Sequence, residues 1–199
     1  LGYVGLPLAV GFARAGFSVT GIDIDKNRVD KINSGENYIS DVDSFELASL
    51  VKKEVLSATF DYQIITELDC ISICVPTPLS KLKDPDVSYI QSALENIVKY
   101  FHSDLLVVLE STTYPGTTEE IIVSFVVKLG FEVGNSIFVS YSPEREDPGN
   151  IIFSTNTIPK LCSGITSECK SIAKLVYESV INEVVMVETT IIAEMAKLL

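Results

Sequence analysis

The sequence predicts a doubly wound α/β fold, in which a mostly parallel sheet carries helices on both faces. Short apolar runs rich in β-branched residues alternate with segments of helical periodicity along almost the whole chain. Several runs, such as CISICV at 70–75 and LLVVL at 105–109, are apolar without alternation, which indicates strands buried on both faces. A parallel sheet covered by helices explains both observations.

The predicted helices and strands follow one another in a regular order. Residues with helical periodicity or a polar helical composition span 8–15, 26–33, 88–101, 117–129, 167–178 and 188–199. Apolar runs typical of strands span 17–24, 70–75, 105–109, 137–141, 157–162 and 184–187. Gly16 and Gly130 end two of the helices, and Pro76 stops the second strand. Residues 81–86 form a polar loop after a strand end, where open α/β sheets bind ligands.

The composition excludes several classes of protein. The 199 residues (21.7 kDa) are 47% hydrophobic and 21% charged, which is typical of a globular chain and not of a disordered one. The net charge of −12 disfavours nucleic acid as a partner, because phosphate contacts need clustered Lys and Arg. A small anionic ligand stays compatible with this charge, since helix N-termini and backbone amides bind phosphate without net positive charge.

No membrane partner, signal peptide or metal site is predicted. The most apolar stretches, such as 121–129, are shorter than the roughly 20 residues of a membrane span, and no basic and apolar leader opens the chain. Cys70 and Cys74 lie in an apolar run, which is typical of reduced core thiols in an intracellular protein. With His102 as the one histidine and no Cys-x-x-Cys pair, zinc is disfavoured. The sequence therefore favours a cytoplasmic protein.

The chain opens in a glycine turn, Gly2-Tyr3-Val4-Gly5. A dinucleotide-binding turn has the pattern Gly-x-Gly-x-x-Gly between the first strand and the first helix, so that a pyrophosphate approaches the backbone closely. Gly2 and Gly5 fit the second and third glycines, and all four residues are candidates for binding a cofactor. The first glycine and the first strand would precede Leu1, so we expect that strand to be truncated. The alternative is a glycine-rich helix start without a ligand.

Asp23 stands at the C-terminal end of the predicted strand 17–24. An acid there hydrogen-bonds the adenosine ribose 2′-hydroxyl and repels a 2′-phosphate, which favours NAD over NADP. Arg28 leaves NADP open, since an arginine nearby can accommodate the 2′-phosphate. Another alternative is that Asp23 caps the helix that begins at Lys26. The sequence contains no P-loop and no Tyr-x-x-x-Lys pair, so the prediction is a Rossmann-like cofactor site.

Three proline-containing turns follow predicted buried strands: VPTP at 75–78, ESTTYPGTT at 110–118 and YSPEREDPG at 141–149. Each places hydroxyl or carboxylate side chains at the carboxyl end of a strand, where α/β sheets bind their ligands. The alternative for each is loop punctuation and helix capping, with Thr117 capping the helix that carries Glu120. Taken one at a time, the turns favour this alternative.

Taken together and in order, the motifs resemble the UDP-glucose/GDP-mannose dehydrogenase family. They are GYVGLP, GIDID, CVPTPL, ESTTYPGTTE, YSPEREDPGN and AEMAKLL, and they cover essentially the whole chain. The resemblance implies the NAD-binding part of an enzyme that oxidises the C6 alcohol of a UDP-sugar to a uronic acid with two NAD+ per turnover. The run SPEREDPGN followed by TIPK most resembles the UDP-N-acetylglucosamine 6-dehydrogenase branch. UDP-N-acetylmannosamine and UDP-glucose are the alternative substrates.

The resemblance also implies roles for individual residues. Thr77 and Thr112 would line the cofactor and active-site cleft, and Thr112 would help to hold a catalytic water. Glu144 matches the family's catalytic glutamate, which is implicated in general acid–base work and thioester hydrolysis. Lys197 matches the lysine that stabilises developing negative charge on the oxygen at C6.

Some of these assignments have alternatives that carry no catalytic role. Arg145, together with Glu144 and Lys197, would contact the substrate, although no specific argument assigns its function. Lys197 could be a solvated lysine on a helix. Glu144 could be a loop carboxylate paired with Arg145 or Lys160.

The chain departs from the family pattern at specific positions. The family's nucleophilic cysteine, and an asparagine one helical turn after the lysine, would lie beyond Leu199, and none of the four cysteines matches. Pro148 stands where UDP-glucose dehydrogenases carry a second glutamate. We therefore expect residues 1–187 to form the NAD-binding domain and 188–199 to begin a long connecting helix, with the substrate domain absent. The piece alone should be inactive, and the full-length protein should form a homodimer or higher oligomer through its C-terminal part.

Two further interpretations stay open. A different Rossmann dehydrogenase, acting on hydroxy acids or hydroxyacyl thioesters, would explain the glycine turn but not YSPEREDPGN. A non-catalytic NAD-binding module would explain the absence of the first glycine and of the nucleophile. The sequence downstream of Leu199 would separate these interpretations, since the enzyme needs a cysteine there.

Overall fold

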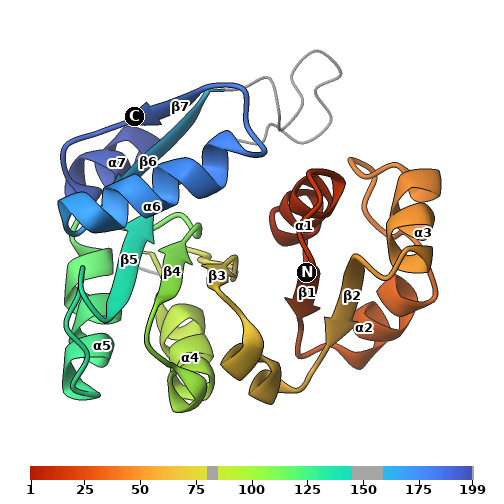
Figure 1. Ribbon diagram of the computed structural model, residues 1–199, viewed down its shortest axis with the longest axis horizontal. Coiled ribbons are helices and arrows are strands. Elements are labelled where there is room, and N and C mark those ends of the chain that lie inside the picture. Colours follow the sequence, from red (N-terminus) through yellow and green to blue (C-terminus); the bar gives the residue numbers. More distant parts are fainter. Residues whose placement is uncertain (80–84, 145–158, 199) are drawn as a thin grey trace. The chain divides into compact units, whose positions relative to one another are not determined.

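The computed structural model describes residues 1–79, 85–144 and 159–198 (Figure 1). These residues form two compact units, of which the first holds Leu1–Tyr62 and the second holds the described residues from Gln63 onward. Each unit has its own sheet and its own buried apolar side chains. Within these ranges, no helix is both long and apolar enough to cross a bilayer.

The first unit combines a short parallel sheet with helices. Its elements are α1 (Gly5–Arg14), β1 (Val19–Ile22), α2 (Lys26–Asn33), α3 (Ser44–Lys52) and β2 (Leu56–Thr59). β1 and β2 pair in parallel, with Val19 opposite Leu56. Asp25 begins α2 by accepting a hydrogen bond from the Asn27 amide at 2.9 Å. Asp43 caps α3 by accepting a hydrogen bond from the Glu46 amide at 2.7 Å.

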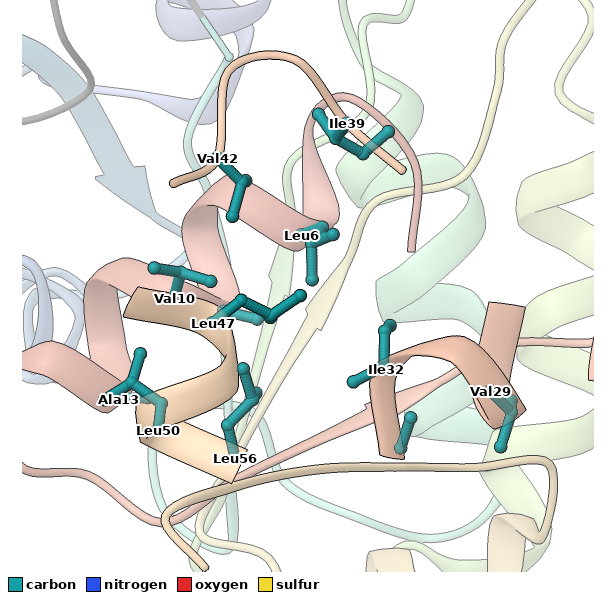
Figure 2. Close-up of a cluster of buried hydrophobic side chains, with 12 residues drawn as sticks. Leu6, Val10, Ala13, Val29, Ile32, Ile39, Val42, Leu47, Leu50 and Leu56 are labelled. Carbon is teal, nitrogen blue, oxygen red and sulfur yellow. The ribbon is translucent and has the colours of Figure 1, made fainter. Parts of the chain in front are cut away.

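Buried aliphatic side chains hold the first unit together (Figure 2). Leu6, Val10 and Ala13 recur at helical spacing along α1 and belong to this cluster. Leu47 and Leu50 of α3 pack in the same cluster, and both are buried. α3 is short, so its stability depends on this packing more than on the helix propensity of its residues.

The second unit contains a mostly parallel sheet in the order β3-β4-β5-β6-β7. Its strands are β3 (Cys70–Ile73), β4 (Leu105–Leu109), β5 (Ile137–Tyr141), β6 (Lys160–Gly164) and β7 (Val184–Met186). The helices from residue 62 onward are η1 (Tyr62–Glu67), α4 (Ser88–Ile97), η2 (Val98–Tyr100), η3 (Thr118–Val123), α5 (Ser124–Lys128), α6 (Ser167–Glu178) and α7 (Thr190–Leu198). η1 and η2 are 3-10 helices, and η3 is a π-helical turn. β5 pairs with β6 antiparallel, whereas the other neighbours in the sheet pair in parallel.

The sheet of the second unit is covered by helices. β4 is buried along its whole length, as its apolar sequence requires. α6 packs across β4 to β7 and α7 packs against β5 and β6, with α6 in front of these strands and α7 behind them in Figure 1. Gly164 of β6 permits the close approach of α6, because a Cβ there would lie 2.6 Å from the Lys170 amide nitrogen.

The predicted fold class is confirmed by the parallel pairing and the covering helices. The predicted bounds of α2, β4, β5 and α6 agree with the structure at both ends. The helix predicted over 117–129 is present as the π-helical turn η3 followed directly by α5. α3 and β2 lie in a stretch for which no element was predicted. Positions 81–84 of the predicted polar loop, and 157–158 of the predicted strand 157–162, lie outside the described residues.

A substitution at Leu47 tests whether the first unit depends on its cluster. Leu47 is fully buried, whereas Phe45 on the same helix is 88% exposed. We expect Leu47→Ala to lower the free energy of unfolding by about 2–5 kcal/mol, because burial is lost and a cavity remains. The control Phe45→Ala should lower it by less than about 0.5 kcal/mol. Denaturant titration followed by circular dichroism measures both, and equal losses would contradict this view of the core.

Candidate functional site

α1 begins directly after the opening glycine turn. Gly5 is its first residue and Val4 its N-cap, and the Leu6 amide donates to the Gly2 carbonyl at 3.0 Å. Within the described residues no side chain caps this helix, and its first turn carries no acid. A Cβ added at Gly2 would meet no atom within 4 Å, and Tyr3 is exposed. The N-terminus of α1 therefore has the polarity and the space that a pyrophosphate requires.

Asp23 follows β1 and its carboxylate is largely buried. Its Oδ1 accepts a hydrogen bond from the Asp25 amide at 2.8 Å. Its Oδ2 lies 3.5 Å from Arg28 Nη1. Burial raises the pKa of Asp23, whereas the Asp25 amide and the Arg28 guanidinium lower it. The Asp23 side chain therefore stands directly after β1, where an acceptor for ribose hydroxyls is expected.

Arg28 is exposed and lies near two carboxylates. Its Nη1 is 3.5 Å from Asp23 Oδ2, and its Nε is 3.7 Å from Asp25 Oδ2. Both acids offset the guanidinium charge that a 2′-phosphate would need, which favours NAD. The alternative in which Asp23 caps α2 is wrong, because Asp25 supplies the cap.

Ser111 joins the turns that follow β3 and β4. Its hydroxyl accepts a hydrogen bond from the Val75 amide at 3.0 Å and lies 2.8 Å from the Val75 carbonyl oxygen. Thr112 is the next residue along the chain, and Thr77 follows Val75 by two positions. Both threonines are half-buried. The turns that carry the two predicted threonines therefore lie side by side.

Glu110, Lys160 and Tyr177 form a buried polar cluster in the second unit. Lys160 Nζ lies 2.8 Å from Glu110 Oε2, and the Tyr177 hydroxyl donates to Glu110 Oε1. The same ammonium lies 5.1 Å from the centre of the Tyr177 ring, within the range of a cation–π contact. Burial raises the pKa of Glu110 even though Lys160 opposes it. Burial alone would lower the pKa of Lys160, but the carboxylates of Glu110 and Glu144 raise it, so Lys160 is an ammonium at neutral pH.

Glu144 follows β5 by three residues and is buried. Its Oε2 lies 3.7 Å from Lys160 Nζ, and Lys197 of α7 donates a hydrogen bond to its backbone carbonyl. The structure thus brings together two of the residues predicted to be catalytic. The pairing with Lys160, predicted as an alternative for Glu144, is present. Arg145, the other predicted partner, lies outside the described residues, as does Pro148.

Glu194 fixes α7 to the turn after β4. Its fully buried carboxylate accepts hydrogen bonds from the Gly116 amide, the Thr118 amide at 2.9 Å and the Thr118 hydroxyl at 2.6 Å. Gly116 has φ +102°, a conformation that favours glycine. The prediction that Thr117 caps the following helix is wrong, because its hydroxyl donates to the Tyr114 carbonyl at 2.7 Å. Instead, the Glu194 carboxylate accepts the hydrogen bond from the Thr118 amide at the start of that helix.

The four cysteines are free thiols. Burial raises the pKa of Cys70 and of Cys162 to about 12, and it also raises the pKa of Cys74. Cys169 is fully buried. Because the thiolate is the reactive form, these thiols are poorly suited to act as nucleophiles.

Three polar residues of the second unit were missed by sequence analysis as site residues: Glu110, Tyr177 and Glu194. A signal exists for Glu110, since a charge directly after the fully apolar run LLVVL needs a buried partner. Glu194 precedes Lys197 by three residues and so shares its side of α7. Tyr177 carries no such signal, because tyrosines are common on amphipathic helices.

A family match covers most of the chain. Residues 1–181 match the model of the UDP-glucose/GDP-mannose dehydrogenase family, NAD binding domain. The chain is 37% identical to protein CapL of Staphylococcus aureus, covering 100% of this chain and 46% of the relative. It is 36% identical to UDP-N-acetyl-D-glucosamine 6-dehydrogenase of Pseudomonas aeruginosa, covering 92% of this chain and 42% of that protein.

Solved structures agree with the family match. The structure of a UDP-D-ManNAc dehydrogenase from Pyrococcus horikoshii matches with a TM-score of 0.91 at 32% identity, covering 100% of this chain and 47% of that chain. The chain therefore spans about half the length of the relatives it matches. The matched domain binds NAD, which makes NAD the cofactor of this chain.

Removal of the Asp23 carboxylate tests its place in the cofactor site. We expect Asp23→Ala to weaken NAD+ binding about 10–100-fold, because a hydrogen bond to a charged group contributes roughly 1.5–3 kcal/mol. Asp30→Ala removes an acid from the exposed surface of α2 and should leave the affinity unchanged. Isothermal titration calorimetry measures both variants. An affinity of Asp23→Ala within about twofold of the unsubstituted protein would remove Asp23 from the site.

Proposed function

Because the chain belongs to the UDP-glucose/GDP-mannose dehydrogenase family, we propose that the protein of which it forms part oxidises the C6 alcohol of a UDP-sugar to a uronic acid. The reaction removes four electrons in two steps and consumes two NAD+. The observation that supports this function best is the contact between Lys197 and the backbone carbonyl of the buried Glu144. Alcohol oxidation requires a base for the proton and a cation for the developing charge on oxygen.

The first unit has the features that fit the adenosine and pyrophosphate parts of NAD. The amides at the start of α1 would bind the pyrophosphate, with Tyr3 and Val4 in the turn between Gly2 and Gly5. Asp23 would accept hydrogen bonds from the ribose hydroxyls, and Arg28 would lie beside them. When bound, NAD+ accepts the hydride that leaves C6.

The second unit would supply the acid–base and electrostatic groups. Glu144 would take the proton of the C6 hydroxyl, and Lys197 would stabilise the negative charge that develops on that oxygen. An ammonium has three N–H donors, so the contact of Lys197 with the Glu144 carbonyl is compatible with a hydrogen bond to the substrate. Thr112 would hold the water that the second oxidation consumes, and Thr77 would contact the cofactor.

We propose UDP-N-acetylglucosamine as the sugar nucleotide. The support is the run SPEREDPGN with TIPK, together with the likeness to the enzyme of Pseudomonas aeruginosa that is named for this sugar. The likeness to the Pyrococcus horikoshii dehydrogenase keeps UDP-N-acetylmannosamine as an alternative. UDP-glucose is the third candidate.

The proposed protein extends beyond the described domain. Residues 1–187 would form the NAD-binding domain, and α7 would belong to a helix that leads to a C-terminal substrate domain with the nucleophilic cysteine and an oligomer interface. The relatives are about twice as long as this chain, which supports this organisation. The free thiols fit a reducing compartment such as the cytoplasm. A non-catalytic NAD-binding module is the alternative, and an assay separates the two.

An assay of the full-length protein tests the reaction. With NAD+ in excess, we expect two NADH for each UDP-sugar oxidised and a uronic acid as the product identified by mass spectrometry. UDP-N-acetylglucosamine should give a higher kcat/KM than UDP-N-acetylmannosamine or UDP-glucose. If none of the three sugars produces NADH, the proposed function is wrong. A stoichiometry of one NADH per sugar would exclude the four-electron reaction.

A substitution at Lys197 tests its role as the cation of the site. We expect Lys197→Ala in the full-length protein to lower kcat about 100–1000-fold with little change in KM, because one stabilising donor of the transition state is lost. Lys174→Ala is the matched control, since Lys174 is an exposed lysine of α6 paired with Glu178 at 3.5 Å. Steady-state kinetics with saturating NAD+ measure both. A loss of kcat smaller than about threefold would mean that Lys197 is an ordinary helix lysine.

A further inference from the structure

Lys160 is a buried cation placed against the carboxylate of Glu144. The residue is 6% exposed, and its Nζ lies 2.8 Å from Glu110 Oε2 and 3.7 Å from Glu144 Oε2. A buried ammonium without carboxylates nearby would be strongly destabilising and would lose its proton. The two glutamates therefore explain how Lys160 stays charged inside the second unit.

Glu110 is held through both of its carboxylate oxygens. Oε2 contacts Lys160, and Oε1 accepts the hydroxyl hydrogen of Tyr177. Glu110 directly follows β4, Lys160 is the first residue of β6, and Tyr177 lies in the last turn of α6. Three separate elements therefore fix the position of the Lys160 ammonium.

Stability alone does not account for this arrangement. A buried ion pair can often be replaced by apolar residues of similar volume without loss of stability. Glu110 already balances the charge of Lys160, so the pair needs no second carboxylate. Glu144 Oε2 nevertheless lies 3.7 Å from the Lys160 ammonium. This contact points to a role of the Glu110–Lys160 pair in holding the Glu144 side chain.

We propose that Lys160, held by Glu110 and Tyr177, is a positioning residue for the carboxylate of Glu144. This role rests on the proposed function of Glu144 as the base. The fixed ammonium holds the Glu144 carboxylate in one orientation, ready to accept the proton of the C6 hydroxyl. Lys197 restrains the main chain of the same residue through its carbonyl. Two lysines thus hold Glu144, one through its side chain and one through its backbone.

The charged and titratable groups around Glu144 come from several elements. Within the described part of the chain they are Lys160 of β6, Glu110 after β4, Cys74 after β3 and Lys197 of α7. Tyr177 of α6 contacts Glu110. Burial raises the pKa of Cys74 and Tyr177, so both are neutral at ordinary pH. Lys160 and Glu110 are therefore the charged neighbours whose removal tests the proposal most directly.

Carbon-13 NMR of the glutamate side-chain carboxyls tests the proposal without any turnover. The full-length protein is labelled, and Glu144→Gln identifies the Glu144 signal. In the charge-balanced variant Glu110→Gln/Lys160→Met the nearer cation is gone, so this signal should titrate about one to three pH units higher. In Glu110→Gln the ammonium remains without its partner carboxylate, so the midpoint should fall. Lys174→Met on the exposed surface of α6 should leave it unchanged.

Opposite shifts in these two variants are a result that general damage to the fold would not produce. An unshifted Glu144 signal in the double variant, or shifts of the same sign in both, would overturn the proposal. Circular dichroism verifies that each variant is folded. Lys160→Arg keeps the positive charge in place, so the Glu144 signal should titrate at nearly the same pH as in the unsubstituted protein. If the double variant does not fold, the direction in which the midpoint of the Glu144 signal moves in Glu110→Gln still tests the proposal.

Kinetics of the same variants give a second readout. In the double variant kcat should fall roughly 100-fold, while KM for the UDP-sugar stays within about threefold. The acidic limb of the pH profile of kcat should move to higher pH. Lys160→Arg should restore most of the activity. An unchanged kcat with an unchanged acidic limb would overturn the proposal. Absence of turnover in the unsubstituted protein would instead reject the proposed function, and the NMR titration would still decide the role of Lys160.

Discussion

The carboxylate of Glu194 is the interaction on which the functional residues of the second unit depend. It lies on α7, is fully buried, and accepts hydrogen bonds from the amides of Gly116 and Thr118. Lys197 lies less than one helical turn further along α7, and Thr112 precedes Gly116 by four residues. One acid therefore connects the helix that carries the proposed cation to the turn that carries the proposed water ligand. Two backbone amides and one hydroxyl bind the same side chain, so the position of α7 relative to this turn is closely fixed.

The fold could be predicted from the sequence where local pattern determines structure. β4 is an uninterrupted apolar run, and β5 is apolar except for Ser140. α2 is a polar segment that begins after the acid that caps it, so the limits of these elements follow from the residues themselves. α3 could not be predicted in this way, because packing of Leu47 and Leu50 in the core of the first unit determines it. β2 is only four residues long, too short for a clear period. The π-helical turn η3 leaves no mark in the apolar pattern, since it lengthens one turn without changing which side chains are apolar.

Sequence reasoning could name candidate site residues only where a motif marks them. Asp23, Glu144 and Lys197 stand in such motifs, and the structure places Glu144 next to Lys197. The groups that hold them come from distant parts of the chain. Glu110 contacts Lys160 at a separation of 50 residues and Tyr177 at a separation of 67 residues. A single sequence does not contain such pairings, because they arise only when β4, β6 and α6 are brought together in the sheet.

The low reactivity expected of the thiols gives the chain a practical property. Raised pKa values keep Cys70, Cys74 and Cys162 protonated at neutral pH, and burial shields Cys169. A cysteine introduced at an exposed position such as Leu175 of α6, which is 69% exposed, would react far faster than any of them with a maleimide. Site-specific spin labels and fluorophores can therefore be attached to the second unit while the natural cysteines stay in place. Spectroscopy of NAD+ binding to this chain then needs no replacement of its four cysteines.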